Sequence, residues 1–216
     1  MISKTRPIYE RGLNVLLPLN NIRHWKPVKD AKEKDNIPWE NKKPRVVWRG
    51  AATGKDKRID LVEKWRNFPD KSRIDVAFTN FLEYYKGDKN PKLLGDRMTI
   101  DELLQNRYLI SVEGNDVASN LKWILATQTV CIMPDPQTES WLMESRLVPW
   151  KHYVPVKSDF SNLMSVLYYC EMHPDKMKEI IKNANLFMEQ FRDQDRETEI
   201  IINVLKGYCD KTNITF

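Results

Sequence analysis

The sequence has little of what membrane-spanning, disulfide-rich or zinc-binding proteins need. Its three cysteines, Cys131, Cys170 and Cys209, are an odd number without a CxxC pair, which predicts neither a disulfide framework nor a zinc site. No run approaches the roughly 20 apolar residues of a membrane span, and the first residues contain no apolar segment typical of a secretory signal. We therefore expect a cytoplasmic protein with no transmembrane segment, no metal and no other cofactor.

The charges exclude a further class. The 216 residues carry a formal net charge of +5, but Lys and Arg alternate with Asp and Glu, as in KPVKDAKEKDN (residues 26–36). That mixture is typical of a solvated surface rather than of a basic stripe, so we expect no nucleic-acid partner. A modest positive charge suits a small acidic ligand such as a nucleoside diphosphate.

From residue 45 onward short β-type runs alternate with helix-like segments. The runs are residues 45–48, 74–78, 108–112, 129–133 and 153–156, and the helix-like segments between them are 59–67, 99–106, 118–127 and 139–146. This alternation predicts an α/β fold, a Rossmann-like parallel sheet with helices on both faces. Helical spacing over residues 158–208 predicts a helical C-terminal tail.

The first 44 residues are less regular and are interpreted as an N-terminal extension, with residues 45–216 as the α/β domain. Residues 13–19 predict a strand, and the polar tract 26–43 predicts a loop with Pro and Trp anchors.

The first candidate site is VVWRGAATGKDKR (residues 46–58), where a strand ends in small residues and cations. Exposed backbone N–H groups, a helix N-terminus and nearby cations hold phosphate in such turns; an ordinary tight loop is the alternative. A P-loop is a poor match, because the spacing is one residue short of GxxxxGK and Asp56 stands where Ser or Thr is required. The candidates are Arg49, Gly50, Thr53, Gly54, Lys55 and Arg58.

A second loop, in YLISVEGNDVASNLKWIL (residues 108–125), has the same form. We expect Gly114 to adopt a positive φ and Ser119 and Asn120 to donate hydrogen bonds to a phosphate or a ribose, with Lys122 one turn into the helix. The remaining candidates of this loop are Glu113, Asn115, Asp116, Val117 and Ala118.

The third candidate is LVPWKHYVPV (residues 147–156), which has two prolines and two aromatic residues immediately before or within a strand. It is interpreted either as a rigid structural corner with a hydrogen-bonded His152 or as a pocket wall formed by Trp150 and His152. Glu139 is a further candidate for a pocket wall.

Together the three stretches read WRG-x-x-T-G-x(3)-R, then YL-I-x-V-x-G-x(3)-A-x(3)-K, then L-x-PW-x-HY-x-PV followed by D-F-S-x-L. In this order and spacing, residues 36–206 resemble glycosyltransferase family 90. The resemblance implies inverting, metal-independent transfer of a glucose- or xylose-type sugar from a UDP-sugar to a hydroxyl of a glycan or protein. It also implies that the chain is mainly the donor-binding lobe of a two-lobed GT-B enzyme, with Arg58 as the cation at the donor diphosphate and residues 1–44 as a remnant of the acceptor side.

The chain departs from the family pattern in two places. Asn120 stands where the family has an arginine that binds phosphate, and only about 45 residues precede the WRG strand, so no catalytic base is assigned. Two functions stay open: a transferase, alone or with a partner chain or a second copy that supplies the missing lobe, and a non-catalytic sugar-nucleotide or glycan-binding module.

Overall fold

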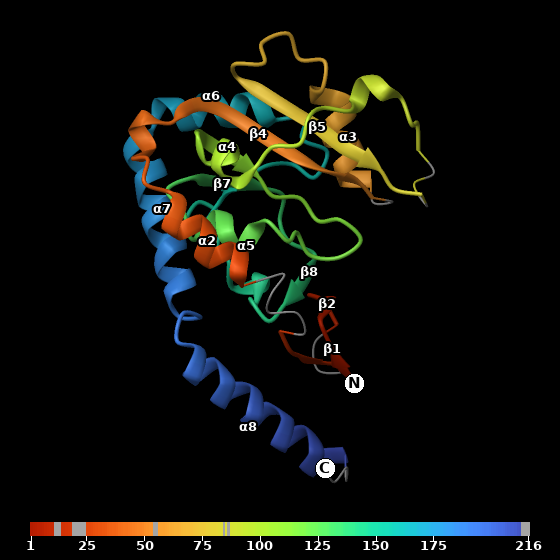
Figure 1. Ribbon diagram of the computed structural model, residues 1–216, viewed down its shortest axis with the longest axis vertical. Coiled ribbons are helices and arrows are strands. Elements are labelled where there is room, and N and C mark those ends of the chain that lie inside the picture. Colours follow the sequence, from red (N-terminus) through yellow and green to blue (C-terminus); the bar gives the residue numbers. More distant parts are fainter. Residues whose placement is uncertain (11–13, 19–24, 54–55, 84, 86, 213–216) are drawn as a thin grey trace.

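The structure is a computed structural model that describes residues 1–10, 14–18, 25–53, 56–83, 85 and 87–212. Its centre is a parallel sheet of five strands in the order β5-β4-β6-β7-β9 (Figure 1). The strands are β4 (Lys43–Ala52), β5 (Ile74–Phe81), β6 (Asn106–Ile110), β7 (Val130–Met133) and β9 (Val154–Pro155). The predicted Rossmann-like α/β fold is therefore confirmed.

The sheet order places β5 on one side of β4 and β6 on the other. From β4 the chain moves outward to β5 and then returns to the other side of β4 as β6, where Val46 pairs with Tyr108 and Val47 with Leu109. On its other side, Val46 pairs with Ile74 of β5. Such a reversal is a topological switch point, and open α/β sheets bind ligands outside the carboxyl ends of the strands at that point.

Helices cover both faces of the sheet, as predicted. Side chains alternate between the faces along each strand, so Val46 and Trp48 pack with α3 and α6, whereas Val47 packs with α2, α4 and α5. Helix α7 contributes to both clusters. These helices are α2 (Lys26–Lys34), α3 (Asp56–Trp65), α4 (Ile100–Leu104), α5 (Leu121–Leu125), α6 (Leu163–Met172) and α7 (Pro174–Glu189).

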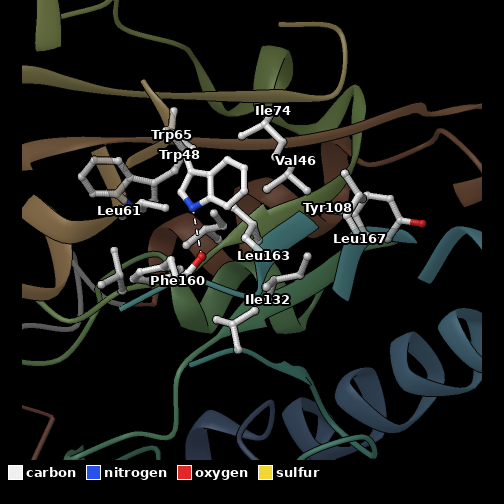
Figure 2. Packing of buried hydrophobic residues seen from close by; sticks show 14 of the residues in the cluster. Val46, Trp48, Leu61, Trp65, Ile74, Tyr108, Ile132, Phe160, Leu163 and Leu167 are labelled. Atoms are coloured by element: carbon white, nitrogen blue, oxygen red, sulfur yellow. Dashed lines mark hydrogen bonds between the residues drawn. The ribbon is translucent and has the colours of Figure 1, made fainter. Parts of the chain in front are cut away.

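The cluster on the α3 and α6 face is built from buried aliphatic and aromatic side chains of the sheet, α3 and α6. Figure 2 shows Trp65 of α3 between the sheet and the segment before α6, with its indole Nε1 donating a 3.0 Å hydrogen bond to the carbonyl oxygen of Phe160. Phe160 has a φ of 56° and is fully buried. This hydrogen bond joins the end of α3 to the turn that begins the C-terminal helices.

The remaining elements are short or lie outside the sheet. Helix α8 (Gln194–Thr212) has no buried residue and extends away from the sheet in Figure 1. Strand β1 (Ile2–Ser3) pairs with β3 (Val15–Leu16), and β2 (Thr5–Pro7) pairs with β8 (Thr138–Ser140). The described residues also form 3-10 turns, namely η1 (Trp39–Asn41), η2 (Pro91–Leu93) and η3 (Glu144–Arg146). Among the helices of the described ranges, none has both the length and the apolar composition that a bilayer crossing requires.

In the first 44 residues, the structure differs from the predicted loop and confirms only part of the predicted strand. The tract 26–43 was predicted as a loop, but it begins with α2, which has Pro27 in its first turn and buries only Val28 and Ala31. Two apolar residues three apart are a weak signal among so many charges. Of the strand predicted at 13–19, Val15–Leu16 form β3, whereas residues 13 and 19 lie outside the described residues.

The segment 139–146 was predicted as helical, but only its last three residues are, as the 3-10 turn η3. It begins in β8, and Met143 adopts a left-handed conformation with a φ of 57° that a helix cannot continue through. Helix α5 is also shorter than the predicted range 118–127, because it begins at Leu121 and ends at Leu125.

Candidate functional site

An open cleft of about 730 Å³ lies at the carboxyl ends of β4 and β6, at the switch point of the sheet. Its walls come from the last residues of β4 and β5, from the segments that follow β4, β5 and β6, from α4 and the residues before it, and from the N-terminal strand region. The residues that line it are Lys4, Trp48, Arg49, Gly50, Ala51, Thr53, Arg58, Thr79, Asn80, Leu82, Arg97, Met98, Leu103, Gly114, Asn115, Asp116, Val117, Ser119 and Asn120. The structure thus brings the two predicted phosphate loops together around one space.

Arg58 is the fixed cation of this cleft. Its guanidinium donates hydrogen bonds to three backbone carbonyls, those of Ala51 at 3.0 Å, Val112 at 3.2 Å and Glu113 at 3.2 Å. It also lies 5.6 Å from the ring centroid of Trp48. Because Ala51 is the last residue but one of β4 and Val112 follows β6, Arg58 joins the two strand ends and places a permanent positive charge between them.

Gly114 leaves the space that this arginine occupies. A Cβ atom built on Gly114 would lie 2.8 Å from the Nη2 atom of Arg58, closer than real contacts allow. The predicted positive φ of Gly114 is wrong, since its φ is outside the left-handed range. The glycine is required for a close approach rather than for an unusual backbone conformation.

Arg49 lies in the cleft wall, but its guanidinium binds groups of the neighbouring strand β5 and of the segment before α4. The Nη2 atom donates to both carboxylate oxygens of Asp75 at 2.8 and 2.9 Å, and Nε donates to the carbonyl of Asp96 at 2.9 Å. The side chain is 10% exposed. Arg49 therefore ties β4 to β5 and to the segment before α4, and it shapes the cleft instead of offering a free cation.

Thr53 and Asn120 are the polar side chains that lie deepest in the two loops. Thr53 is buried, and its Oγ1 has no hydrogen-bond partner within the described ranges. Asn120 donates a 3.0 Å hydrogen bond to the carbonyl of Ile110, and its Oδ1 accepts one from Ser111 at 3.2 Å. Asn120 thus supports the end of β6 at the edge of the cleft.

Two of the predicted cations and glycines cannot be placed. Gly54 and Lys55 lie outside the described residues, so their predicted contacts with a phosphate stay predictions. The other predicted residues of the second loop differ in exposure: Asn115 and Ser119 are exposed on the cleft, whereas Val117 and Ala118 are buried. Ala118 faces the core cluster and not the cleft.

Lys122 was predicted at the ligand and lies in the interior instead. Its side chain is 1% exposed, and its Nζ is 3.6 Å from Oε1 of Glu144 and 5.4 Å from the ring centroid of Trp141. Burial lowers the pKa of Lys122, and the Glu144 carboxylate opposes that shift. Glu144 in turn accepts hydrogen bonds from Ser140 N at 2.6 Å and Ser140 Oγ at 2.8 Å.

Glu113 and Glu139 also have structural partners. Glu113 forms a 2.9 Å ion pair with Lys57, and its other carboxylate oxygen accepts 2.9 Å hydrogen bonds from the backbone N–H groups of Gln137 and Thr138. Glu139 is 4% exposed and forms a 2.7 Å ion pair with Arg6. Neither lines the cleft.

Trp150 and His152 form a structural corner, which is the first of the two interpretations given to that stretch. Trp150 has a φ of 61° and packs edge-on against Tyr169 at 5.0 Å. His152 is buried, its Nδ1 accepts a 2.9 Å hydrogen bond from the backbone N–H of Val148, and its ring packs against Phe187. Burial, together with the charge of Lys151, lowers the pKa of His152, so the ring is neutral. The corner precedes β9 and lies outside the cleft.

The sequence analysis missed two cations of the cleft. Arg97 is exposed on the segment before α4, and Lys4 reaches the cleft from the N-terminal strand region. Neither belongs to a motif, because the chain brings both to the switch point from segments without phosphate-loop spacing. Within the described ranges, no group of three or more His, Cys, Asp and Glu side chains has the arrangement of a metal site.

The fold and the cleft define the class: a doubly wound α/β domain in which two loops and the cation Arg58 meet at the switch point. The model of glycosyl transferase family 90 matches residues 12–215, and the chain belongs to this family. O-glucosyltransferase LpsA from Dichelobacter nodosus is 37% identical over 206 residues, which are 95% of this chain and 60% of that protein. Protein O-glucosyltransferase 2 from Danio rerio is 29% identical over 143 residues, 66% of this chain and 28% of that protein.

A solved structure is also similar, the C-terminal domain of the glycosyl transferase group 1 family protein LpcC from Francisella tularensis. The TM-score is 0.43 at 12% identity, over 77% of this chain and 91% of that one. Relative to its sequence relatives the chain is short, since it spans 60% of the Dichelobacter nodosus protein and 28% of the Danio rerio protein.

Proposed function

We propose that this chain is the donor-binding part of a glycosyltransferase that moves a glucose- or xylose-type sugar from a UDP-sugar to a hydroxyl of a glycan or protein, with inversion and without a metal. The observation that carries the proposal is the position of Arg58, a charged side chain held between the ends of β4 and β6 inside the switch-point cleft. Ligands of open α/β sheets bind at that place.

The chemistry needs a positive environment at the leaving group. When the bond between the anomeric carbon and the diphosphate oxygen breaks, negative charge grows on the diphosphate, and fixed cations and N–H groups stabilise it. Arg58 is already held by three carbonyls, so its charge need not be brought into position as the reaction proceeds. Family membership and the O-glucosyltransferase relatives support a sugar as the group that is transferred.

The acceptor side is not assigned. A carboxylate must take the proton of the attacking hydroxyl, and the cleft carboxylate that the described residues supply, Asp116, is engaged by Lys4 at 3.0 Å. We expect the base to come from a further lobe in a GT-B arrangement, on the same polypeptide, a partner chain or a second copy. The relatives are longer than this chain, which is consistent with that expectation.

The test is a panel of UDP-glucose, UDP-xylose, UDP-galactose and UDP-N-acetylglucosamine, measured both by thermal shift and by release of UDP. We expect UDP and at least one UDP-sugar to raise the Tm, with UDP-glucose or UDP-xylose as the donor that is turned over, and with no change on addition of EDTA. Absence of any stabilisation by UDP would contradict the proposal. Activity abolished by EDTA and restored by manganese would contradict its metal-independent part.

The second candidate function is a non-catalytic sugar-nucleotide or glycan-binding module. The observation in its favour is the pairing of Asp116 with Lys4, which leaves the cleft without an unpaired carboxylate within the described ranges. The same panel, repeated in the presence of the lobe that supplies the base, separates the two functions, because a binding module is stabilised by UDP-sugars and releases no UDP even then.

A further inference from the structure

The N-terminal residues are held at the cleft by two independent contacts. Strand β2 pairs antiparallel with β8, with Thr5 opposite Ser140 and Pro7 opposite Thr138. Arg6 adds an ion pair of 2.7 Å with the buried Glu139. Figure 1 shows β1 and β2 beside β8, below the sheet. Residues 5–7 are therefore anchored, and the side chain immediately before them has a fixed origin.

That side chain is Lys4, and it enters the cleft. Its Nζ donates a 3.0 Å hydrogen bond to Oδ2 of Asp116 in the second phosphate loop, and the side chains of Lys4 and Asp116 are 35% and 33% exposed. Although partial burial opposes it, hydrogen bonds from Thr5 and Lys4 keep the pKa of Asp116 below its usual range. Asp116 is thus an ionised partner for Lys4 at neutral pH.

Among the described residues of the two loops, no side chain besides Arg58 offers a cation to a second phosphate. Asn120 is neutral, Lys122 is buried against Glu144, and Arg49 is bound by both oxygens of Asp75. A lysine ammonium has three protons to donate, and within the described ranges the hydrogen bond to Asp116 uses one of them. Like Arg97, Lys4 reaches the cleft from outside the two loops, and it has the location and the donor capacity that the described side chains of the loops lack.

We propose that Lys4 is a binding residue for the diphosphate of the nucleotide, contributed from the N-terminal segment, and that Asp116 is the resting partner of its ammonium, from which the diphosphate takes it over. The proposal rests on the proposed function. It assigns the N-terminal segment to the donor side and compensates for the neutral Asn120.

The experiment compares UDP affinities of the full chain by calorimetric titration. Lys4→Ala should raise the Kd for UDP about tenfold, since one charge-assisted hydrogen bond is removed, and it should leave the Kd for uridine nearly unchanged. Asp116→Asn should act in the opposite direction and lower the Kd for UDP, because it removes an anion beside the phosphates and releases the ammonium. Lys176→Ala is the matched control: its ion pair with Glu179 is 2.9 Å long, the lysine is 36% exposed, and it lies outside the cleft.

Opposite signs for Lys4→Ala and Asp116→Asn support the proposal. If both variants raise the Kd for UDP equally, the pair of Lys4 and Asp116 serves only to hold the second loop in place, and the proposal is overturned. If the wild-type chain binds UDP and Lys4→Ala binds it as well as Lys176→Ala does, the assignment of Lys4 fails while the proposed function stands. If the wild type binds no UDP, both fail together.

Discussion

Two strand–loop–helix connections of this molecule look alike in sequence and use their cations differently. After β4, the third residue of α3 is Arg58; after β6, the second residue of α5 is Lys122. Arg58 lines the cleft and is held by backbone carbonyls, whereas Lys122 is 1% exposed and faces Glu144. A cation in the first turn after a parallel strand is therefore insufficient evidence for a phosphate site.

The difference follows from how the two helices are buried. Helix α3 buries Leu61, Val62 and Trp65 and leaves its first turn at the edge of the sheet, but all five residues of α5, LKWIL, are buried. A helix that is apolar around its whole circumference lies inside the protein, and a lysine within it must be buried too. Such a lysine needs a carboxylate partner, which Glu144 provides.

The largest effect that tests this comparison is on stability. Lys122→Ala leaves Glu144 buried without its counter-charge, and we expect the free energy of unfolding to fall by about 3–5 kcal/mol, measured by urea denaturation at pH 7. The UDP affinity of the folded fraction should stay at the wild-type value. The control is Lys178→Ala, which breaks an exposed ion pair with Glu40 and should change stability little. A stable Lys122→Ala variant with weakened UDP binding would show that Lys122 contacts the ligand, as the sequence predicts.

The next effect is on affinity. Arg58→Ala should weaken the free energy of UDP binding by about 1.5–3 kcal/mol, because a charge-assisted contact to the diphosphate is lost. It should also lower the Tm, since Arg58 joins the ends of β4 and β6. Arg58→Lys keeps the charge but not the three carbonyl contacts, so we expect it to recover part of the affinity and little of the Tm.

Arg66→Ala is the matched control for Arg58→Ala. Arg66 follows the other end of α3 and also donates to backbone carbonyls, those of Lys92 and Leu94, without lining the cleft. It should lower the Tm and leave the UDP affinity unchanged. Equal UDP affinities for Arg58→Ala and Arg66→Ala would show that Arg58 only stabilises the ends of β4 and β6.

Much of the fold was predictable from the sequence, and the reason is physical. The central strands are continuous apolar runs such as Val130–Met133, as expected for strands buried on both faces. Thr99 and Glu102 form a capping box at the start of α4, and a Thr followed three residues later by a Glu is the local signal for it. The loops that meet at the switch point were predictable because each follows such a strand.

The failures concern long-range partners. Nothing local indicates that Asp75 binds Arg49, that Glu144 lies against Lys122, or that Lys4 reaches a loop 112 residues away. These contacts depend on the sheet order and on the pairing of β2 with β8, and the residue spacing within a single motif predicts neither. Local patterns predicted which segments form the site, and the tertiary structure decides which of their side chains face it.

The smallest effect concerns Asn120, where the family pattern has an arginine. The Asn120 side chain holds the carbonyl of Ile110 and the hydroxyl of Ser111, so Asn120→Arg gains a charge near the cleft and loses support for the end of β6. With Arg58 and Lys4 already present, we expect the Kd for UDP to change by less than about threefold, or roughly 0.7 kcal/mol. Asn120→Ala isolates the loss of support, because it removes the hydrogen bonds without adding charge. A gain of tenfold or more in Asn120→Arg, absent in Asn120→Ala, would mean that the wild-type cleft lacks a cation, and it would favour a binding module whose donor affinity has declined.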